Sequence, residues 1–294
     1  SMKIIKDIDL PQGSQEWLDV RSKCGMASEV GALLGVSKWE PKTPLALWKI
    51  KNGEVKIDTN FAMDHGNKYE DEARTMFEED MGGTWEPVVV INEFDEVPIG
   101  ASLDGWKESD NTILEIKCPL KGASSELWQE VSTTALLPEQ YWLQCQQQLL
   151  VTNSAKLYFW VYDAKSAAGL LQVVVPHIKT QANIINAWTK YFSMDKPEPT
   201  SADLIETSDA EWLKKAKEWR EIHNVLQEVK TAEETLRADL IELSKGQSFI
   251  GGGVQLKHGK SKGRVNYKNI PELKGVNIED YRGDEIIKHY IKMI

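Results

Sequence analysis

The stretch that decides the fold is Gly100-Ala-Ser-Leu-Asp-Gly105 together with Ile113-Leu-Glu-Ile-Lys-Cys-Pro119. Side chains along a strand alternate between its two faces, so Glu115 and Lys117 share one face, about 7 Å apart. The apolar residues between them face the other side, toward a core. Asp104 ends the preceding apolar run, and the turn after it allows the two runs to pair as an antiparallel hairpin. Asp104 and Glu115 are therefore expected to converge.

Two carboxylates and a lysine at one point suit a particular chemistry. Mg²⁺ and Mn²⁺ prefer oxygen ligands and keep several waters, so Asp104, Glu115 and the strand carbonyl of Ile116 fit them better than they fit zinc. Phosphodiester cleavage needs a nucleophile generated at neutral pH and stabilisation of growing negative charge, which metal ions and an ammonium such as Lys117 supply. The combination predicts a metal-dependent nuclease centre. Taken alone, the Glu-x-Lys pair is more typical of a solvated edge strand.

The combination resembles the PD-(D/E)XK nuclease superfamily and, within it, the phage recombination exonucleases of the lambda-exonuclease type, also called viral recombinases. The resemblance covers roughly residues 10–195 and depends on four separated blocks in matching order. These blocks are Trp17–Arg21 with Ala27–Val30, Ala62–Met63 with Gly66–Glu70 and Ala73–Arg74, Asp104 with Glu115–Pro119, and Tyr141–Gln146.

The resemblance implies roles for the matching polar residues. Asp104 and Glu115 would bind metal, and Lys117 would assist the attacking water. Glu70 would reach the metal from a neighbouring helix, and Gln144 would lie beside the site. The implied cofactor is Mg²⁺ or Mn²⁺, with two ions per site.

The resemblance also implies a substrate and partners. Arg21 and Ser28 match positions that bind the terminal 5′ phosphate of duplex DNA, and the family digests one strand from 5′ to 3′, leaving a 3′ single strand. A single-strand annealing protein would take that strand over during recombination. Relatives form homo-oligomeric rings, and a phage or prophage protein of this kind would act in the cytoplasm of a bacterial host.

Each of these residues has a structural alternative. Glu70 is placed to pair with Arg74 one helical turn on, a contact worth a few tenths of a kcal/mol. Ser28 precedes a helical pattern as an N-cap would, although such a helix terminus also attracts anions. Gln144 belongs to a polar helix face. Arg21 is an ordinary surface arginine, or a fork that holds a phosphate in bidentate fashion.

The composition narrows the class of protein. A chain of 294 residues with 41% hydrophobic content can bury a large core, and no segment is typical of a membrane span or signal peptide. Three widely spaced cysteines suggest neither a disulfide framework nor a zinc ribbon, which fits a reducing cytoplasm. The net charge of -10 argues against a protein that coats nucleic acid non-specifically, but it does not exclude a nuclease with a local basic track.

The order of elements predicts an α/β fold with a PD-(D/E)XK restriction-endonuclease-like core, a central mixed sheet flanked by helices. Helices are expected within 14–53 and over 66–81, 138–150 and 178–192. The expected strands are 86–91, 97–103, 112–118, 156–162 and 169–175. The nuclease core would span residues 1–197, ending near Pro197-Glu-Pro199.

The remaining residues, 198–294, predict a helical plus β-hairpin extension. Apolar residues from Trp212 to Leu243 recur at near-heptad spacing, which indicates a long helix or helical hairpin, with Glu233 interrupting the seam. Its face would pack on the nuclease core or, alternatively, on an oligomer or partner. A β-hairpin with a basic tip at 257–264 and a terminal helix at 278–294 would follow.

The leading hypothesis is a Mg²⁺-dependent deoxyribonuclease that resects linear double-stranded DNA ends. One alternative is a structure-specific or restriction-type endonuclease on the same core. Another is a catalytically idle DNA-end-binding scaffold, which the presence of all the expected acids and the lysine disfavours.

Overall fold

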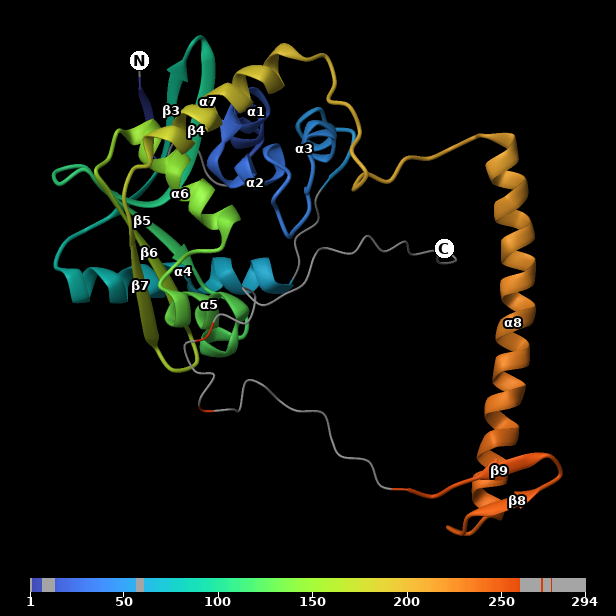
Figure 1. The fold of residues 1–294 in the computed structure, drawn as a ribbon. Helices are drawn as coiled ribbons and strands as arrows, with labels where there is room; N and C mark the ends of the chain where they lie inside the picture. The colour runs from blue at the N-terminus through green and yellow to red at the C-terminus, as the bar shows by residue number, and fades with distance from the viewer. Residues whose placement is uncertain (1, 7–13, 57–60, 260–270, 272–275, 277–294) are drawn as a thin grey trace. The chain divides into compact units, whose positions relative to one another are not determined.

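The structure is a computed structural model that describes residues 2–6, 14–56, 61–259, 271 and 276. It divides into two units, Ser1–Leu204 and Ile205–Ile294, which we describe separately (Figure 1). The sequence places a boundary after residue 197, slightly earlier, and the assignment of a nuclease domain to residues 1–197 stays a prediction. None of the described helices is both long enough and apolar enough to cross a membrane.

A seven-stranded sheet forms the centre of the first unit (Figure 1). Its hydrogen-bonded order is β1-β3-β4-β5-β6-β7, and β2 lies beside β4. The pairs β5–β6 and β2–β4 are parallel and the other pairs antiparallel, so the predicted mixed sheet is confirmed. The strands are β1 (Lys3–Lys6), β2 (Gly25–Met26), β3 (Glu86–Phe94), β4 (Val97–Lys107), β5 (Thr112–Lys117), β6 (Lys156–Asp163) and β7 (Ala168–Val174).

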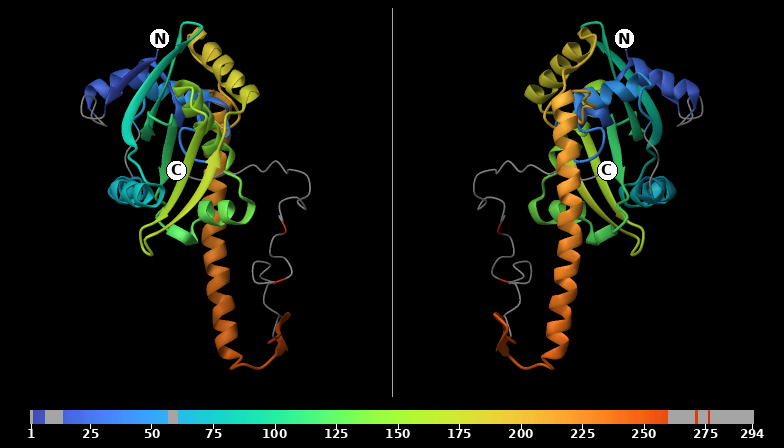
Figure 2. Two further views of the ribbon diagram at one scale, coloured as in Figure 1. Left: turned by 90° about the vertical axis from the view of Figure 1, so that its left-hand side faces the viewer. Right: turned by 90° about the vertical axis from the view of Figure 1, so that its right-hand side faces the viewer.

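Helices cover both faces of this sheet (Figure 2). Several begin at side-chain caps: Ser14, Thr43 and Ser125 each accept a hydrogen bond from a backbone N–H of the first turn. The helices are α1 (Gln15–Lys23), the 3₁₀ helix η1 (Ala27–Glu29), α2 (Val30–Leu33), α3 (Pro44–Lys51), α4 (Phe61–Met81), the 3₁₀ helix η2 (Gly122–Ser124), α5 (Glu126–Thr134), α6 (Glu139–Thr152) and α7 (Ile178–Ser193).

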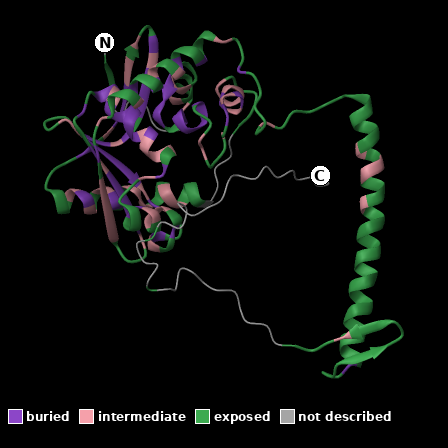
Figure 3. Cartoon of the chain, in the orientation of Figure 1, coloured by how far each residue is buried: buried purple, intermediate pink, exposed green. Residues whose placement is uncertain are grey.

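The alternation along β5 fixes which helix faces the polar pair. Ile113 joins a hydrophobic cluster built with α2, α6 and α7, whereas Leu114 and Ile116 join a second cluster with Ala73 and Phe77 of α4. Both clusters consist of buried residues, and many residues of the central strands β4, β5 and β6 are buried (Figure 3). The odd-numbered residues of β5 therefore face α6. Glu115 and Lys117 are among them, so both charged side chains lie on the side of this helix.

Four elements of the first unit were not predicted: β1, β2, the 3₁₀ helix η2 and helix α5. β1 and β2 are short, and their apolar pattern is too brief to indicate strands; β2 exists because it pairs with the centre of β4, from Gly25 beside Ile99 to Met26 beside Gly100. Helix α5 was also missed. Helix α4 begins at Phe61, before its predicted start at residue 66.

The second unit contains α8 (Ala210–Leu243) and the hairpin β8 (Phe249–Gly251) with β9 (Val254–Leu256). The periodic stretch is thus one continuous helix, and the helical hairpin considered as an alternative does not form. The hairpin turn consists of Gly252 and Gly253, both at positive φ, as two-residue hairpin loops require. It lies earlier than the predicted basic tip. Residues 260–264 of that tip and the predicted terminal helix at 278–294 are outside the described residues.

Candidate active site

The site lies where β4 and β5 separate. The two strands pair from Gly105 beside Leu114 to Lys107 beside Thr112, and the pairing ends there. Beyond that point the side chain of Asp104 replaces the partner strand, because its Oδ2 accepts a hydrogen bond of 2.7 Å from the backbone N–H of Ile116. The predicted hairpin thus forms near its turn and opens at Asp104.

Glu115 lies in the opening and is almost fully buried, with 2% of its surface exposed. Its Oε1 accepts a hydrogen bond from Nζ of Lys117 at 2.5 Å and one from Nε2 of Gln144 at 2.9 Å. Its Oε2 accepts one from Nε2 of Gln148 at 2.6 Å. Gln144 and Gln148 are one turn apart on α6, so a single helix face supplies both amides. The carboxylate is held by one cation and two amide donors.

A third carboxylate approaches from α4. Oε1 of Glu70 pairs with Nη2 of Arg74 at 2.7 Å, which is the helical pair expected as the structural alternative. Arg74 also donates from Nε to the backbone carbonyl of Asp104 at 2.8 Å. Arg74 therefore holds Glu70 next to the end of β4 at Asp104. The ion pair between Glu70 and Arg74 is thus compatible with a position of Glu70 in the site.

The electrostatics of this group are those of crowded carboxylates around one lysine. Burial, and then the charges of Glu115 and Glu70, raise the pKa of Asp104 well above its usual range. Burial also raises the pKa of Glu70, with a contribution from Glu115 that the nearby Arg74 opposes. Burial lowers the pKa of Lys117, but Glu115 and Asp104 outweigh it and raise that pKa above its usual value. Lys117 is therefore an ammonium at neutral pH.

The donor set fits a hard divalent cation by its chemistry. Asp104, Glu115 and Glu70 offer carboxylate oxygens, and a cation among them would relieve the repulsion that raises the pKa of Asp104. Oε1 of Gln148 is also buried and has no hydrogen-bond partner among the described residues. Within the described ranges, however, no three His, Cys, Asp or Glu side chains are gathered closely enough to hold a metal ion. Glu115 is turned toward its lysine and amide partners, so it would have to exchange one of them for the ion.

Asp104→Asn is expected to stabilise the metal-free protein at neutral pH. Above the ordinary pKa of aspartate, about 3.9, the unfolded chain releases a proton that the folded Asp104 retains, so folding loses stability as pH rises. An asparagine at this position does not titrate and still accepts from the N–H of Ile116. We expect a gain of about 1 kcal/mol, or roughly 2–4 °C in Tm, at pH 7.

Thermal unfolding in EDTA at pH 5 and pH 8 measures this effect, with the exposed Asp80→Asn as a matched control. The difference between variant and wild type should grow with pH. A difference in Tm that is independent of pH would show that the pKa of Asp104 is not raised in the folded protein.

Arg21 and Ser28 are brought together near the same end of the sheet. Nη2 of Arg21 donates to Oγ of Ser28 at 3.1 Å and pairs with Oε1 of Glu29 at 3.3 Å. Glu29 also pairs with Nζ of Lys51 at 2.8 Å, so one buried carboxylate faces two cations. Because β2 runs parallel to β4 and toward its Asp104 end, the chain that follows β2 carries Ser28 in that direction.

The predicted N-cap role of Ser28 is wrong. Ser28 lies inside η1, and α2 is a helix of only four residues with no side-chain cap at Glu29. The helix terminus expected to attract an anion is therefore not formed there. The positive charge at this place comes from side chains: Arg21, which also lies 4.6 Å from the centre of the Trp17 ring, and Lys51.

Several residues of the site were not identified from the sequence. Lys51 and Glu29 meet although they lie far apart in the chain, and no local pattern points to their pairing. Tyr141 lies with its ring centre 5.2 Å from Nζ of Lys117. Gln148 carried a signal, because it follows Gln144 by one helical turn, but only the fold turns that face toward Glu115.

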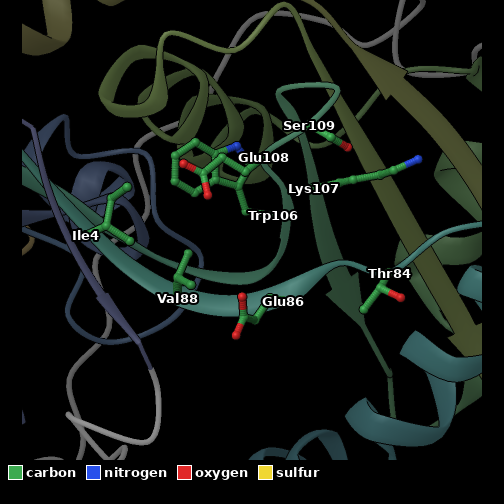
Figure 4. Close-up of a pocket in the computed structure, with 8 residues that line it drawn as sticks. All are labelled: Ile4, Thr84, Glu86, Val88, Trp106, Lys107, Glu108 and Ser109. Atoms are coloured by element: carbon green, nitrogen blue, oxygen red, sulfur yellow. The ribbon is translucent and has the colours of Figure 1, made fainter.

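Among the described residues of the first unit, two hollows differ in their relation to the site. One, of about 600 Å³, is lined by Ile4, Thr84, Glu86, Val88 and residues 106–109, none of them a predicted site residue (Figure 4). Its lysine, Lys107, is already paired with Asp110 at 2.6 Å. The other, of about 450 Å³, is lined by His65, Tyr69 and residues 119–124 and 163–165. This second hollow adjoins the active site in sequence, because Tyr69 precedes Glu70 and Pro119 follows Lys117 closely.

Comparisons with known proteins found one domain family and several similar structures. Residues 16–155 match the model of the YqaJ-like viral recombinase domain. The alkaline exonuclease LHK-Exo from Laribacter hongkongensis has a similar structure, with a TM-score of 0.50 and 22% identity over 61% of this chain and 91% of that chain. The structure of LHK-Exo in complex with dAMP gives a TM-score of 0.51 with the same identity and coverage. No curated protein matches the chain. At this identity the likeness concerns the fold alone, and it confirms the predicted α/β architecture of a central mixed sheet flanked by helices.

Proposed function

We propose, from the premise that residues 16–155 form a YqaJ-like viral recombinase domain, that this chain is a metal-dependent exonuclease acting on linear double-stranded DNA. It would digest one strand from 5′ to 3′ and leave a 3′ single strand for recombination by strand annealing. The observation that carries the proposal is the grouping of Asp104, Glu115 and Lys117 at the opening between β4 and β5.

That grouping supplies what phosphodiester hydrolysis requires. Asp104 and Glu115 would hold the metal, joined by Glu70 and the carbonyl of Ile116; Mg²⁺ or Mn²⁺ suits this oxygen set, and we propose two ions per site. When bound, such ions supply an activated water and neutralise charge on the phosphate. Lys117, held as an ammonium, would stabilise negative charge on the scissile phosphate and orient the attacking water.

Gln144 would act as a positioning residue. Its amide donates to the same oxygen of Glu115 that Lys117 contacts, so it stays bound to the carboxylate when Lys117 turns toward a phosphate. Glu115 would then keep its orientation throughout the reaction. Gln148 supports the other carboxylate oxygen in the same way.

The cluster of Arg21, Ser28, Glu29 and Lys51 would receive the terminal 5′ phosphate. Two cations face one carboxylate, which leaves an excess positive charge beside a hydroxyl donor. Arg21 is partly exposed, with 22% of its side chain accessible, so its guanidinium can exchange the hydroxyl of Ser28 for a phosphate oxygen. Holding the end in this way would make the enzyme begin at DNA termini.

The second hollow would carry the strand that leaves or enters the active site. The rings of His65 and Tyr69 lie 4.7 Å apart, and Nζ of Lys68 lies 5.0 Å from the centre of the Tyr69 ring. Aromatic faces beside cations are suited to unpaired bases and their backbone.

The assay that tests the function compares one plasmid in closed circular and linearised form, with Mg²⁺ or with EDTA. The linear form should be degraded only with the metal, and the closed form should remain intact. A label at the 5′ terminus should be released before one at the 3′ terminus. Cleavage of the circle would favour the endonuclease alternative, and binding without cleavage in Mg²⁺ or Mn²⁺ would favour the idle scaffold.

Metal binding by Asp104 has its own test. Mn²⁺ should raise the Tm of the wild-type protein, because a ligand that binds only the folded state stabilises it. The same addition should have little effect on Asp104→Asn. An equal shift in both proteins would place the metal elsewhere.

The setting of the activity is also proposed. A single-strand annealing protein would receive the 3′ strand, the enzyme would act in the cytoplasm of a phage-infected or lysogenic bacterium, and a homo-oligomeric ring would keep it on its DNA. The domain match supports this setting through its description as a viral recombinase.

A further inference from the structure

The long helix α8 exposes an apolar face that none of the described residues of its own unit covers. It spans 34 residues from Ala210 to Leu243, and none of them is buried (Figure 3). Ile222, Val229 and Leu236 expose 70%, 60% and 64% of their surfaces. A helix of this length is stabilised mainly by packing its apolar face. The face therefore needs a partner.

The spacing of that face is the heptad of a coiled coil. From residue 212 to residue 243 the a and d positions of this frame follow one another at gaps of three and four, and all of them are apolar except Lys215 and Glu233, which keeps one seam against a partner helix. The a positions are Trp212, Trp219, Leu226, Glu233 and Leu240, and the d positions are Lys215, Ile222, Val229, Leu236 and Leu243.

The two charged members of the seam determine the partner and its direction. Lys215 and Glu233 have opposite charges and lie nine positions on either side of Asn224. In a parallel pair of identical helices, each would meet its own copy and two like charges would be buried together. In an antiparallel pair centred on Asn224, Lys215 meets Glu233 of the second copy, and this happens twice.

Within the overlap from Trp212 to Leu236 the remaining layers of the antiparallel register are apolar, whereas Leu240 and Leu243 lie beyond this overlap. Reversing one helix sets each a position against a d position, and the resulting pairs are Trp212 with Leu236, Trp219 with Val229 and Ile222 with Leu226. Val225, which is outside the seam and 59% exposed, comes next to its own copy at the two-fold axis. At the edges, Arg237 approaches Asp209 of the second copy, whereas Glu211 approaches Asp239, so the edges favour neither direction. The seam decides.

We propose that α8 joins two copies of this chain as an antiparallel coiled coil centred on Asn224. The surface is self-complementary, as a two-fold interface requires. The assembly therefore contains an even number of chains, and each pair of helices links two N-terminal units. The proposal does not depend on the nuclease function.

A charge exchange on the full-length protein tests the pairing. Lys215→Glu or Glu233→Lys sets like charges against each other in both layers and should raise the dissociation constant at least tenfold, halving the mass measured by light scattering at micromolar concentration. The double variant Lys215→Glu/Glu233→Lys restores both opposite pairs and should restore the mass. Lys214→Glu makes the same charge change outside the seam and should leave it unchanged.

The same mass measurements distinguish the antiparallel pair from other partners that could cover this face of α8. If α8 packs on the N-terminal unit or on the chain beyond residue 276, the mass does not respond to any of these variants, and the proposal fails. If the helices pair in parallel, each single variant only exchanges one like-charge pair for another, so neither variant halves the mass, and the antiparallel register fails.

A second measurement does not require a change in the seam. The cysteines at 24, 118 and 145 are buried, so a spin label attached at Glu242→Cys reports on α8 selectively. Antiparallel helices place two such labels about 50 Å apart, at 1.5 Å per residue from the centre, whereas parallel helices place them side by side. A short distance overturns the antiparallel register.

Discussion

Lys117→Ala is expected to reduce DNA degradation by about 10²- to 10³-fold or more, while binding to duplex ends is retained. Lys117 is the cation at the centre of the site, 2.5 Å from Oε1 of Glu115. Its raised pKa keeps it charged across the neutral range, which suits the proposed role of stabilising negative charge rather than that of accepting a proton. Binding survives because the cations proposed to hold the DNA end, Arg21 and Lys51, are separate from it.

Single-turnover degradation of an end-labelled duplex measures the loss, and fluorescence anisotropy in EDTA measures binding. Lys156→Ala, an exposed lysine on the neighbouring strand β6, is the matched control and should retain full activity. Removing Lys117 also leaves the buried Glu115 without a cation, which can destabilise the fold. Lys117→Gln keeps a donor to Glu115 and should be folded but inactive. Full activity in either variant would reject the assignment.

Arg21→Ala is expected to abolish the preference for 5′-phosphorylated ends over 5′-hydroxyl ends. A charge-assisted hydrogen bond contributes about 1.5–3 kcal/mol, which corresponds to roughly a 10- to 100-fold difference between the two ends in the wild type. Arg21 is the more accessible cation of its cluster, with 22% of its side chain accessible, whereas Lys51 is held at Glu29 with only 4% accessible. Loss of the arginine should therefore slow the phosphorylated substrate selectively.

The measurement is the ratio of initial rates on two duplexes that differ only in the 5′ terminus. Arg21→Lys keeps the charge but not the two-pronged geometry, and should show an intermediate ratio. Lys23→Ala, an exposed cation at the end of the same helix, should keep the wild-type ratio. If Arg21→Ala slows both substrates equally, the cluster has a structural role and the phosphate lies elsewhere.

The local sequence determined the strands of the core and the orientation of the central polar pair. The alternation in β5 separates Glu115 and Lys117 from Leu114 and Ile116, and the clusters on the two faces confirm this separation. The period of two is a property of the extended backbone itself, so it can be read without knowledge of the partners. The same holds for the 3.5-residue period of α8, which the structure shows as one helix.

Only the tertiary structure decided which distant residues meet these local patterns. Three contacts join residues of different elements: Asp104 with the N–H of Ile116 where β4 separates from β5, Gln148 with Glu115, and Lys51 with Glu29. The two-residue strand β2 forms only because its backbone pairs with that of β4. Such contacts depend on how elements pack, and packing is settled by the burial of many side chains at once. The sequence therefore determined the identity and spacing of the acids and the lysine, whereas the fold determined what holds them in place.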